Sequence, residues 1–177
     1  MRLNNRKAVS ALVATVLLIL ITVAAVGIIW GAIMPMLNRA MEMGQACLNA
    51  RLTIDTTSGY TCYKSTTTEA MIMVGRGAEE FDLAGMNIMV SGGGQSKTFL
   101  IKNGTAVQAD GINIGVKMVD GKTTMDIPKP NEERTYILFI GTNLSSVEEV
   151  KVAPLAKVGN TERTCDISSK VPLTTCV

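Results

Sequence analysis

The feature that most constrains this chain is an apolar stretch near its N-terminus, RKAVSALVATVLLILITVAAVGIIWGAIMPML. It runs from Arg6 to Leu37 and has no charged residue after Lys7. As a helix, Val9 to Leu37 would be roughly 43 Å long, whereas about 20 apolar residues are enough to cross a bilayer. A cleavable secretory signal has an apolar region of roughly 7–15 residues. The stretch therefore predicts a membrane-spanning helix rather than a secretory signal.

The charges beside this stretch predict its orientation. Arg2, Arg6 and Lys7 all precede it, and basic residues that flank a membrane helix stay on the cytoplasmic side. We therefore expect the N-terminus in the cytoplasm and the residues after the helix outside the cell.

Small residues within the stretch point to close helix packing. Gly27 and Gly31 form a G-x-x-x-G pair, a spacing that lets helix backbones approach each other in a membrane. Glycine is also common in any membrane helix, so the pair alone is a weak signal. Together with Pro35, the two glycines predict a helix that bends or loosens locally between Val26 and Met36.

The apolar pattern continues beyond the length that a lipid anchor requires. Between Met34 and Leu48 only Arg39 and Glu42 are charged. A helix that is apolar on all faces must be buried on all faces, either by lipid or by copies of the same helix. In the second case the result is a filament, an open head-to-tail assembly with a central bundle of helices.

The residues at the start of the stretch resemble a known family. Arg6-Lys7-Ala8, followed without a spacer by Val9-Ser10-Ala11-Leu12 and a long aliphatic run, is similar to the class III signal of archaeal type IV pilins and the related archaellins. The resemblance covers the chain up to about residue 40. Members often have Ser-Pro where this chain has Ser10-Ala11. Val13 stands where bacterial pilins carry a glutamate, which favours an archaeal pattern over a bacterial one.

The resemblance implies a processing route and a domain organisation. A prepilin peptidase would cut after Lys7-Ala8, so that the mature chain begins at Val9. Residues 1–8 would be the leader peptide, 9–46 the hydrophobic assembly and membrane helix, and 47–177 an extracellular β-sandwich domain. The partners implied are further copies in a helical homopolymer, the prepilin peptidase, a pilus assembly platform, and the membrane before assembly.

The residues after Cys47 predict an all-β domain. Short β-rich runs follow one another at Leu48–Thr57, Tyr60–Tyr63, Ala70–Val74, Leu83–Val90, Thr98–Ile101, Ile112–Val119 and Tyr136–Ile140. Asn-Gly at Asn103 and Asp-Gly at Asp110 and Asp120 are typical of hairpin turns. Several short strands at this spacing indicate an immunoglobulin-like sandwich. The expected fold class is therefore α+β: a long N-terminal hydrophobic helix followed by that sandwich.

The chain has four cysteines, Cys47, Cys62, Cys165 and Cys176. An even number in a domain expected outside the cell predicts disulfides. Three pairings are possible, and closeness in sequence favours Cys47–Cys62 and Cys165–Cys176. The spacing lacks the tight C-x-x-C pattern of a zinc site, so we expect no metal.

Composition weighs against catalysis and nucleic-acid binding. The chain has no histidine, which removes the commonest general base and metal ligand. Its net charge is +2 and aromatic residues make up 4%, so neither a basic face nor stacking platforms are expected. The glutamate pairs at Glu79, Glu132 and Glu148 each consist of adjacent residues, which point to opposite faces of a strand. We expect neither an enzyme nor a cofactor.

Two further patterns have a plainer structural explanation. Gly92-Gly93-Gly94-Gln95-Ser96-Lys97-Thr98 lacks the glycine spacing of a phosphate-binding loop, so a hairpin loop is favoured. Eleven methionines could suggest a copper(I) site. Their places in predicted strands and in the helix favour packing instead.

Asn103 and Asn143 each begin an N-x-[ST] sequence, which is the acceptor pattern for N-linked sugar. The pattern is frequent by chance, so the sequence favours neither glycosylation nor its absence at these two residues. In a surface filament a glycan at these loops would face solvent.

The expected function is that of a structural subunit of an archaeal type IV pilus-like filament used for adhesion or cell contact. The resemblance leaves the archaellin of a motility filament as a close alternative. A single-pass membrane protein that displays a binding domain is the alternative from another class.

Overall fold

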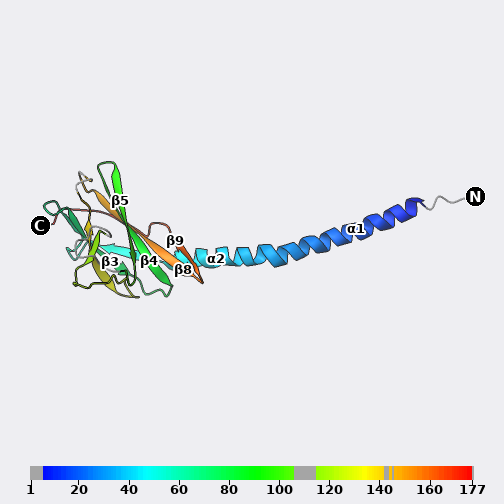
Figure 1. Cartoon of the computed structure of the whole chain (residues 1–177), viewed down its shortest axis with the longest axis horizontal. Helices are drawn as coiled ribbons and strands as arrows, with labels where there is room; N and C mark the ends of the chain where they lie inside the picture. Colours follow the sequence, from blue (N-terminus) through cyan, green and yellow to red (C-terminus); the bar gives the residue numbers. More distant parts are fainter. Residues whose placement is uncertain (1–5, 106–114, 142–143, 145, 177) are drawn as a thin grey trace, which may run out of the picture. The chain divides into compact units, whose positions relative to one another are not determined.

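The computed structural model describes residues 6–105, 115–141, 144 and 146–176, with side chains described from Leu12 onwards. The chain divides into two compact units, Met1–Glu42 and Met43–Val177. The described residues of the first unit are helical, and the second unit contains the end of the helix and all ten strands of the described residues (Figure 1).

The N-terminal helix consists of three consecutive segments. They are α1 (Arg6–Ile28), the π-helical segment η1 (Ile29–Ile33) and α2 (Met34–Asn49). In η1 the backbone N–H of Met34 donates to the carbonyl of Ile29, one residue further back than in an α-helix. Pro35 follows directly; it has no N–H, and its ring would crowd the carbonyl of Gly31 in a regular α-helix. The wider turn lies inside the interval in which the sequence predicts a loosened helix.

The strands form two antiparallel sheets of five strands each. The first sheet has the order β1-β3-β7-β6, with β2 also paired to β3, and the second has the order β10-β8-β4-β5, with β9 also paired to β8. The strand bounds are β1 Leu52–Asp55, β2 Cys62–Lys64, β3 Glu69–Arg76, β4 Leu83–Gly92, β5 Gln95–Lys102, β6 Val116–Met118, β7 Glu133–Phe139, β8 Glu149–Val158, β9 Thr161–Thr164 and β10 Ser169–Pro172.

The core lies between the two sheets because each central strand turns alternate apolar side chains inward. The buried members from these strands are Ala70, Ile72 and Val74 on β3, Met86, Ile88 and Val90 on β4, Tyr136 and Leu138 on β7, and Val150 and Val152 on β8. Each large aliphatic side chain buried in this way contributes about 1.5–3 kcal/mol of transfer free energy. The fold class is as predicted: α+β, with a long apolar helix followed by a sandwich-like pair of antiparallel sheets.

The strand β4 turns into β5 through a two-residue hairpin. Ser91 pairs with Ser96 and Gly92 with Gln95, while Gly93 and Gly94 take positive φ values of 60° and 77°. Both central residues at positive φ define the turn that matches the twist of a hairpin. The glycine-rich run is therefore a hairpin, as the sequence favours, and not a phosphate-binding loop.

Two predictions about strands are wrong in detail. The run Leu48–Thr57 is not one strand, because α2 continues to Asn49 and β1 begins only at Leu52. The strands β8, β9 and β10 lie beyond the last run that the sequence predicts. In β8 charged and apolar residues alternate, as in Glu149-Val150-Lys151-Val152, and this period-2 pattern is itself a strand signal.

The segment that includes β10 closes one side of the sandwich. The hydroxyl of Ser168 accepts from the backbone N–H of Leu52 and donates to its carbonyl, both at 2.8 Å. The hydroxyl of Ser169 accepts from the N–H of Ile54 at 3.2 Å. Further on, the N–H of Cys176 donates to the carbonyl of Tyr63 at 2.9 Å. The C-terminal segment thus pairs with β8 of the second sheet and also binds β1 and β2 of the first.

Candidate functional site

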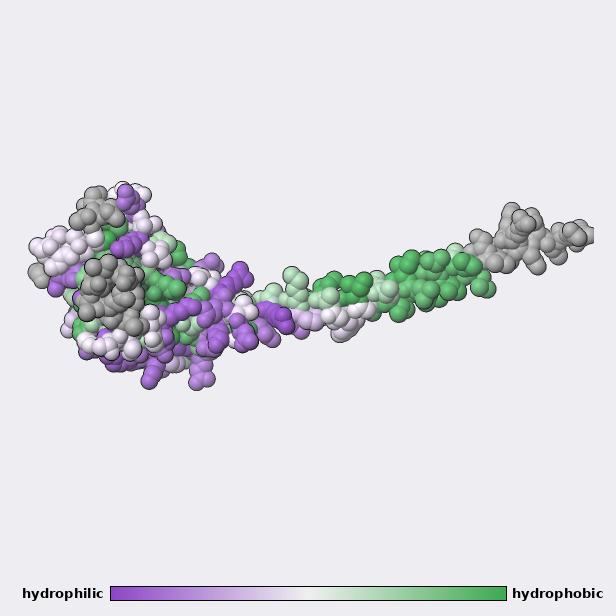
Figure 2. Space-filling view, viewed as in Figure 1, coloured by the Kyte–Doolittle hydropathy of each residue, from purple (hydrophilic) through white to green (hydrophobic). Residues whose placement is uncertain are grey.

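The most distinctive surface of the protein is the helix before Met43. Every residue from Leu12 to Glu42 is exposed, and from Leu12 to Ile33 nearly all of them are apolar, as the face shown in Figure 2 illustrates. From Leu12 to Asn49 the helix is long and apolar enough to cross a membrane by length and composition. A signal sequence near the N-terminus would pass the same test. A surface of this kind is stable only in lipid or against other apolar surfaces.

The two threonines in the described part of α1 have hydrogen-bond partners inside the helix. The hydroxyl of Thr15 donates to the carbonyl of Leu12, and that of Thr22 to the carbonyl of Ile19, each at 2.8 Å. A hydroxyl left without a partner in an apolar medium costs several kcal/mol. Both threonines can therefore enter lipid or a helix bundle without that penalty.

Gly27 and Gly31 leave room on the helix surface. A Cβ atom built at either glycine would meet nothing within 4 Å outside the local helix. The surface at which the sequence suggests close helix packing is thus not covered by other residues of the same chain. Gly31 belongs to the π-helical segment. Pro35 is the second residue of α2.

The residues of the expected peptidase site lie at the N-terminal end of α1. Lys7, Ala8 and Val9 follow Arg6, the first residue of that helix. Their side chains lie outside the part of the chain for which side chains are described, so cleavage at this site remains a prediction from the sequence.

All four cysteines form disulfides, as predicted, but the favoured pairing is wrong. Cys47 is bonded to Cys165 and Cys62 to Cys176, at sequence separations of 118 and 114 residues. The pairing follows from the fold, because the C-terminal segment returns to the end of α2 and to β2. Closeness in sequence does not predict this return, because the return depends on β8, β9 and β10, which lie beyond the last strand that the sequence predicts.

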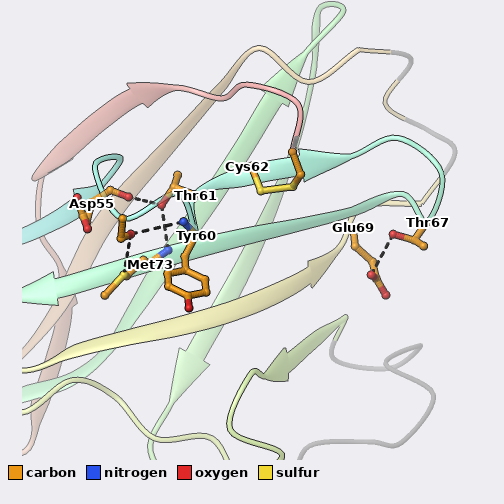
Figure 3. Close-up of a disulfide and its surroundings, with 9 residues drawn as sticks. Asp55, Tyr60, Thr61, Cys62, Thr67, Glu69 and Met73 are labelled. Atoms are coloured by element: carbon orange, nitrogen blue, oxygen red, sulfur yellow. Dashed lines mark hydrogen bonds between the residues drawn. A yellow bond between two sulfur atoms is a disulfide. The ribbon is translucent and has the colours of Figure 1, made fainter.

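The disulfide Cys62–Cys176 lies beside a buried hydroxyl (Figure 3). Thr61 donates to the carbonyl of Asp55, and its oxygen accepts from the backbone N–H of Met73 at 3.2 Å. Thr61 is the one buried polar side chain among the described residues. Thr61 thus binds the last residue of β1 and the middle of β3, and it anchors the residue directly before Cys62.

A cluster of charged residues lies on the β8–β10 edge of the second sheet. The carboxylate of Glu149 forms ion pairs with Lys151 and with Lys170, the latter at 2.7 Å. Hydrogen bonds from these two lysines, Lys151 first, lower the pKa of Glu149 to about 2. The pair with Lys170 joins the neighbouring strands β8 and β10, whereas the pair with Lys151 lies within β8.

A second cluster surrounds Arg134 on β7. Its guanidinium contacts Glu132 at 2.6 Å, Asp120 at 3.3 Å and Asp126 at 3.7 Å. Two residues further along β7, the hydroxyl of Tyr136 donates to the backbone carbonyl of Asp126 at 2.6 Å. Burial of the Tyr136 side chain raises the pKa of its phenol. These contacts order the turn before β7 and hold the tyrosine in the core.

The structure describes one of the two expected glycosylation residues, Asn103. Asn103 is exposed in the turn after β5 and is accessible to modification. Asn143 lies outside the described residues. Glycosylation of either residue remains a prediction.

Within the described residues no group of three or more cysteine, aspartate or glutamate side chains could hold a metal ion. Met86, Met118 and Met125 are buried in the core, in agreement with the packing interpretation of the methionines.

Sequence reasoning missed the residues that bind the C-terminal segment to the first sheet, above all Ser168 and Ser169. A pair of serines before a short apolar run has no distinctive local signature, so only the tertiary structure reveals their role. Comparison with known proteins adds no identification, because no protein-family model and no curated protein matches this chain.

Proposed function

We propose that this protein is a structural subunit of an extracellular filament of the archaeal type IV pilus kind. The observation that carries the proposal is the exposed apolar surface of the helix from Leu12 to Ile33, present on every side. In this role copies of the helix bury one another in the filament core, and the β-domains form the outer layer. The filament serves adhesion or cell contact.

The helix supports this function through its length and its small residues. The helix Leu12–Asn49 has 38 residues, whereas roughly 20 residues are enough to cross a membrane. The additional helical turns provide surface that neighbouring helices can bury. The open surface at Gly27 and Gly31 allows such neighbours to approach closely. The precursor spans the membrane with its N-terminus in the cytoplasm until the peptidase cuts between Ala8 and Val9 and the assembly platform takes up the subunit.

The disulfides support a location outside the cytoplasm, since disulfides persist in oxidising surroundings. Both disulfides join segments more than a hundred residues apart. They therefore stabilise the folded β-domain outside the cell, where no chaperone is available. A motility filament built from the same parts is the close alternative within this class.

The proposal is tested by the intact mass and N-terminal sequence of protein sheared from the cell surface. The expected chain begins at Val9 and lacks four hydrogens for two disulfides, and the sheared material contains filaments in electron micrographs. Recovery from membranes alone, with the chain starting at Met1, would show instead a single-pass anchor that displays its β-domain.

A further inference from the structure

A groove lies at the end of α2 and is built wholly from the second unit. It measures about 740 Å³ and is lined by the last turns of α2, the start of β1 and the segment between β9 and β10. Leu48 is 75% exposed and Ile167 is 54% exposed on its surface. The disulfide Cys47–Cys165 joins two of its walls, so α2 and the segment after β9 are held together covalently at that point.

Three charged residues line the same groove. They are Arg51, Arg163 and Asp166, all exposed. None of the three takes part in an ion pair within the residues that the structure describes. The groove therefore offers an apolar floor together with two positive charges and one negative charge.

One segment of this chain has the complementary surface. Met36–Glu42 of α2 carries exposed apolar side chains, with Met36 at 76% and Met41 at 54%, and two charges, Arg39 and Glu42. In a helix these two charges lie three residues apart, about 5 Å along the axis and on neighbouring positions of one face. Glu42 matches the arginines of the groove, and Arg39 matches Asp166.

The chain cannot supply this segment to its own groove. The helix α2 is continuous from Met34 to Asn49, and Met43 and Leu48 of that helix already line the groove. An intrachain fit would require α2 to break between Glu42 and Met43. We infer that the groove binds the segment Met36–Glu42 of a second copy of this chain. The inference rests on the proposed function and names one contact within the filament.

Photo-cross-linking in assembled filaments tests this contact. Ile167 of the full chain is replaced by the photoreactive residue benzoylphenylalanine, and Leu100 by the same residue as a matched control. Leu100 is also about half exposed but lies on β5, away from the groove. After irradiation, a covalent dimer on a denaturing gel identifies a cross-link between copies, and peptide mapping identifies the residues joined.

The Ile167 variant is expected to give a dimer joined to residues 36–42, and the Leu100 variant is not. Filaments in which Ile167 cross-links to lipid, to α1, to another protein or to nothing would overturn this inference and leave the proposed function standing. A wild-type chain that never forms filaments would overturn both.

Charge reversal gives a second test with an internal rescue. Arg163→Glu and Glu42→Arg are each expected to raise the concentration needed for assembly about two- to fivefold, as expected for exposed ion pairs. The double variant should return close to the wild-type value. Lys157→Glu, an exposed lysine on β8 outside the groove, serves as the control. Additive losses in the double variant would contradict the pairing.

Discussion

Cys47, in the last turn of α2, is bonded to Cys165, the residue that follows β9, across 118 residues of sequence. The bond ties the end of the helix to the second sheet, while the chain itself leads from α2 into β1 of the first sheet. The end of the helix is therefore held to both sheets. Any load on the helix reaches the whole β-domain through two covalent routes.

Removing this bond is expected to lower the free energy of unfolding of the β-domain. A closed loop of this length stabilises a protein by about 3–5 kcal/mol through loss of freedom in the unfolded chain. The double variant Cys47→Ala, Cys165→Ala is compared with wild type by thermal unfolding of the full chain in detergent. The matched variant Cys62→Ala, Cys176→Ala removes the bond that closes a loop of 114 residues, and it should lose a similar free energy of unfolding. Unchanged melting of both variants would contradict this account.

Gly92→Ala is expected to disrupt the β4–β5 hairpin. A Cβ at this position would clash with the carbonyl oxygen of Ser146, so the backbone must move, at a cost of about 1–3 kcal/mol for overpacking. Gly77→Ala is the control, because its Cβ would meet only Glu79, at 3.6 Å. Chemical denaturation measures both variants, and equal stability of the two would show that the contact at Gly92 is unimportant.

The stability of the β-domain is expected to fall in acid through Glu149. Its pKa is about 2 in the folded protein, against 4.5 ordinarily, so its contribution is complete above about pH 4.5 and is lost as the pH falls towards 2. Glu149→Gln should flatten the curve of unfolding midpoint against pH in this window. Glu79→Gln, on an exposed residue that forms no ion pair among the described residues, controls for the removal of one carboxylate. Equal slopes in wild type and Glu149→Gln would refute the prediction.

Gly27→Leu is expected to block assembly without unfolding the β-domain. The leucine side chain would fill the open surface through which a second helix approaches. Val26→Leu changes the neighbouring residue conservatively and should assemble normally. Electron microscopy counts the filaments, and the mass of the disulfide-bonded chain checks the fold. Normal filaments from Gly27→Leu would mean that the helices do not pack closely there.

Ala8→Leu is expected to prevent removal of the leader and therefore to abolish surface filaments. A bulky residue before the cut should exclude the chain from a peptidase that accepts small residues there, as the resemblance implies. The N-terminal sequence of the membrane fraction reports processing directly. A simple membrane anchor would be indifferent to the change, so normal processing and normal fibres would exclude the pilin assignment.

Local patterns were sufficient for several features. The uncharged run after Lys7 predicts the helix, because hydrophobicity over this length overrides every other local preference. Gly31 and Pro35 predict its loosened turn, since proline cannot complete the regular hydrogen-bond ladder. Gly93 and Gly94 predict the hairpin because few other residues adopt positive φ.

The pairing of the cysteines and the last three strands needed the tertiary structure. Cys165 and Cys176 lie near each other in sequence, yet each bonds to a cysteine more than a hundred residues away. Their partners depend on where β8 and β10 lie in the second sheet, which is set by packing against β4 and not by local propensity.

The sequence by itself determined that this protein has a membrane-competent helix and an oxidised β-domain, because hydrophobicity and cysteine number are properties of composition and order. Only the tertiary structure decided that the C-terminal segment closes the sandwich, that both disulfides are long-range, and that a charged groove forms at the end of α2. Each of these features brings together residues that are far apart in sequence. Leu48 and Ile167, for example, line the same groove only because of the complete path of the chain through both sheets.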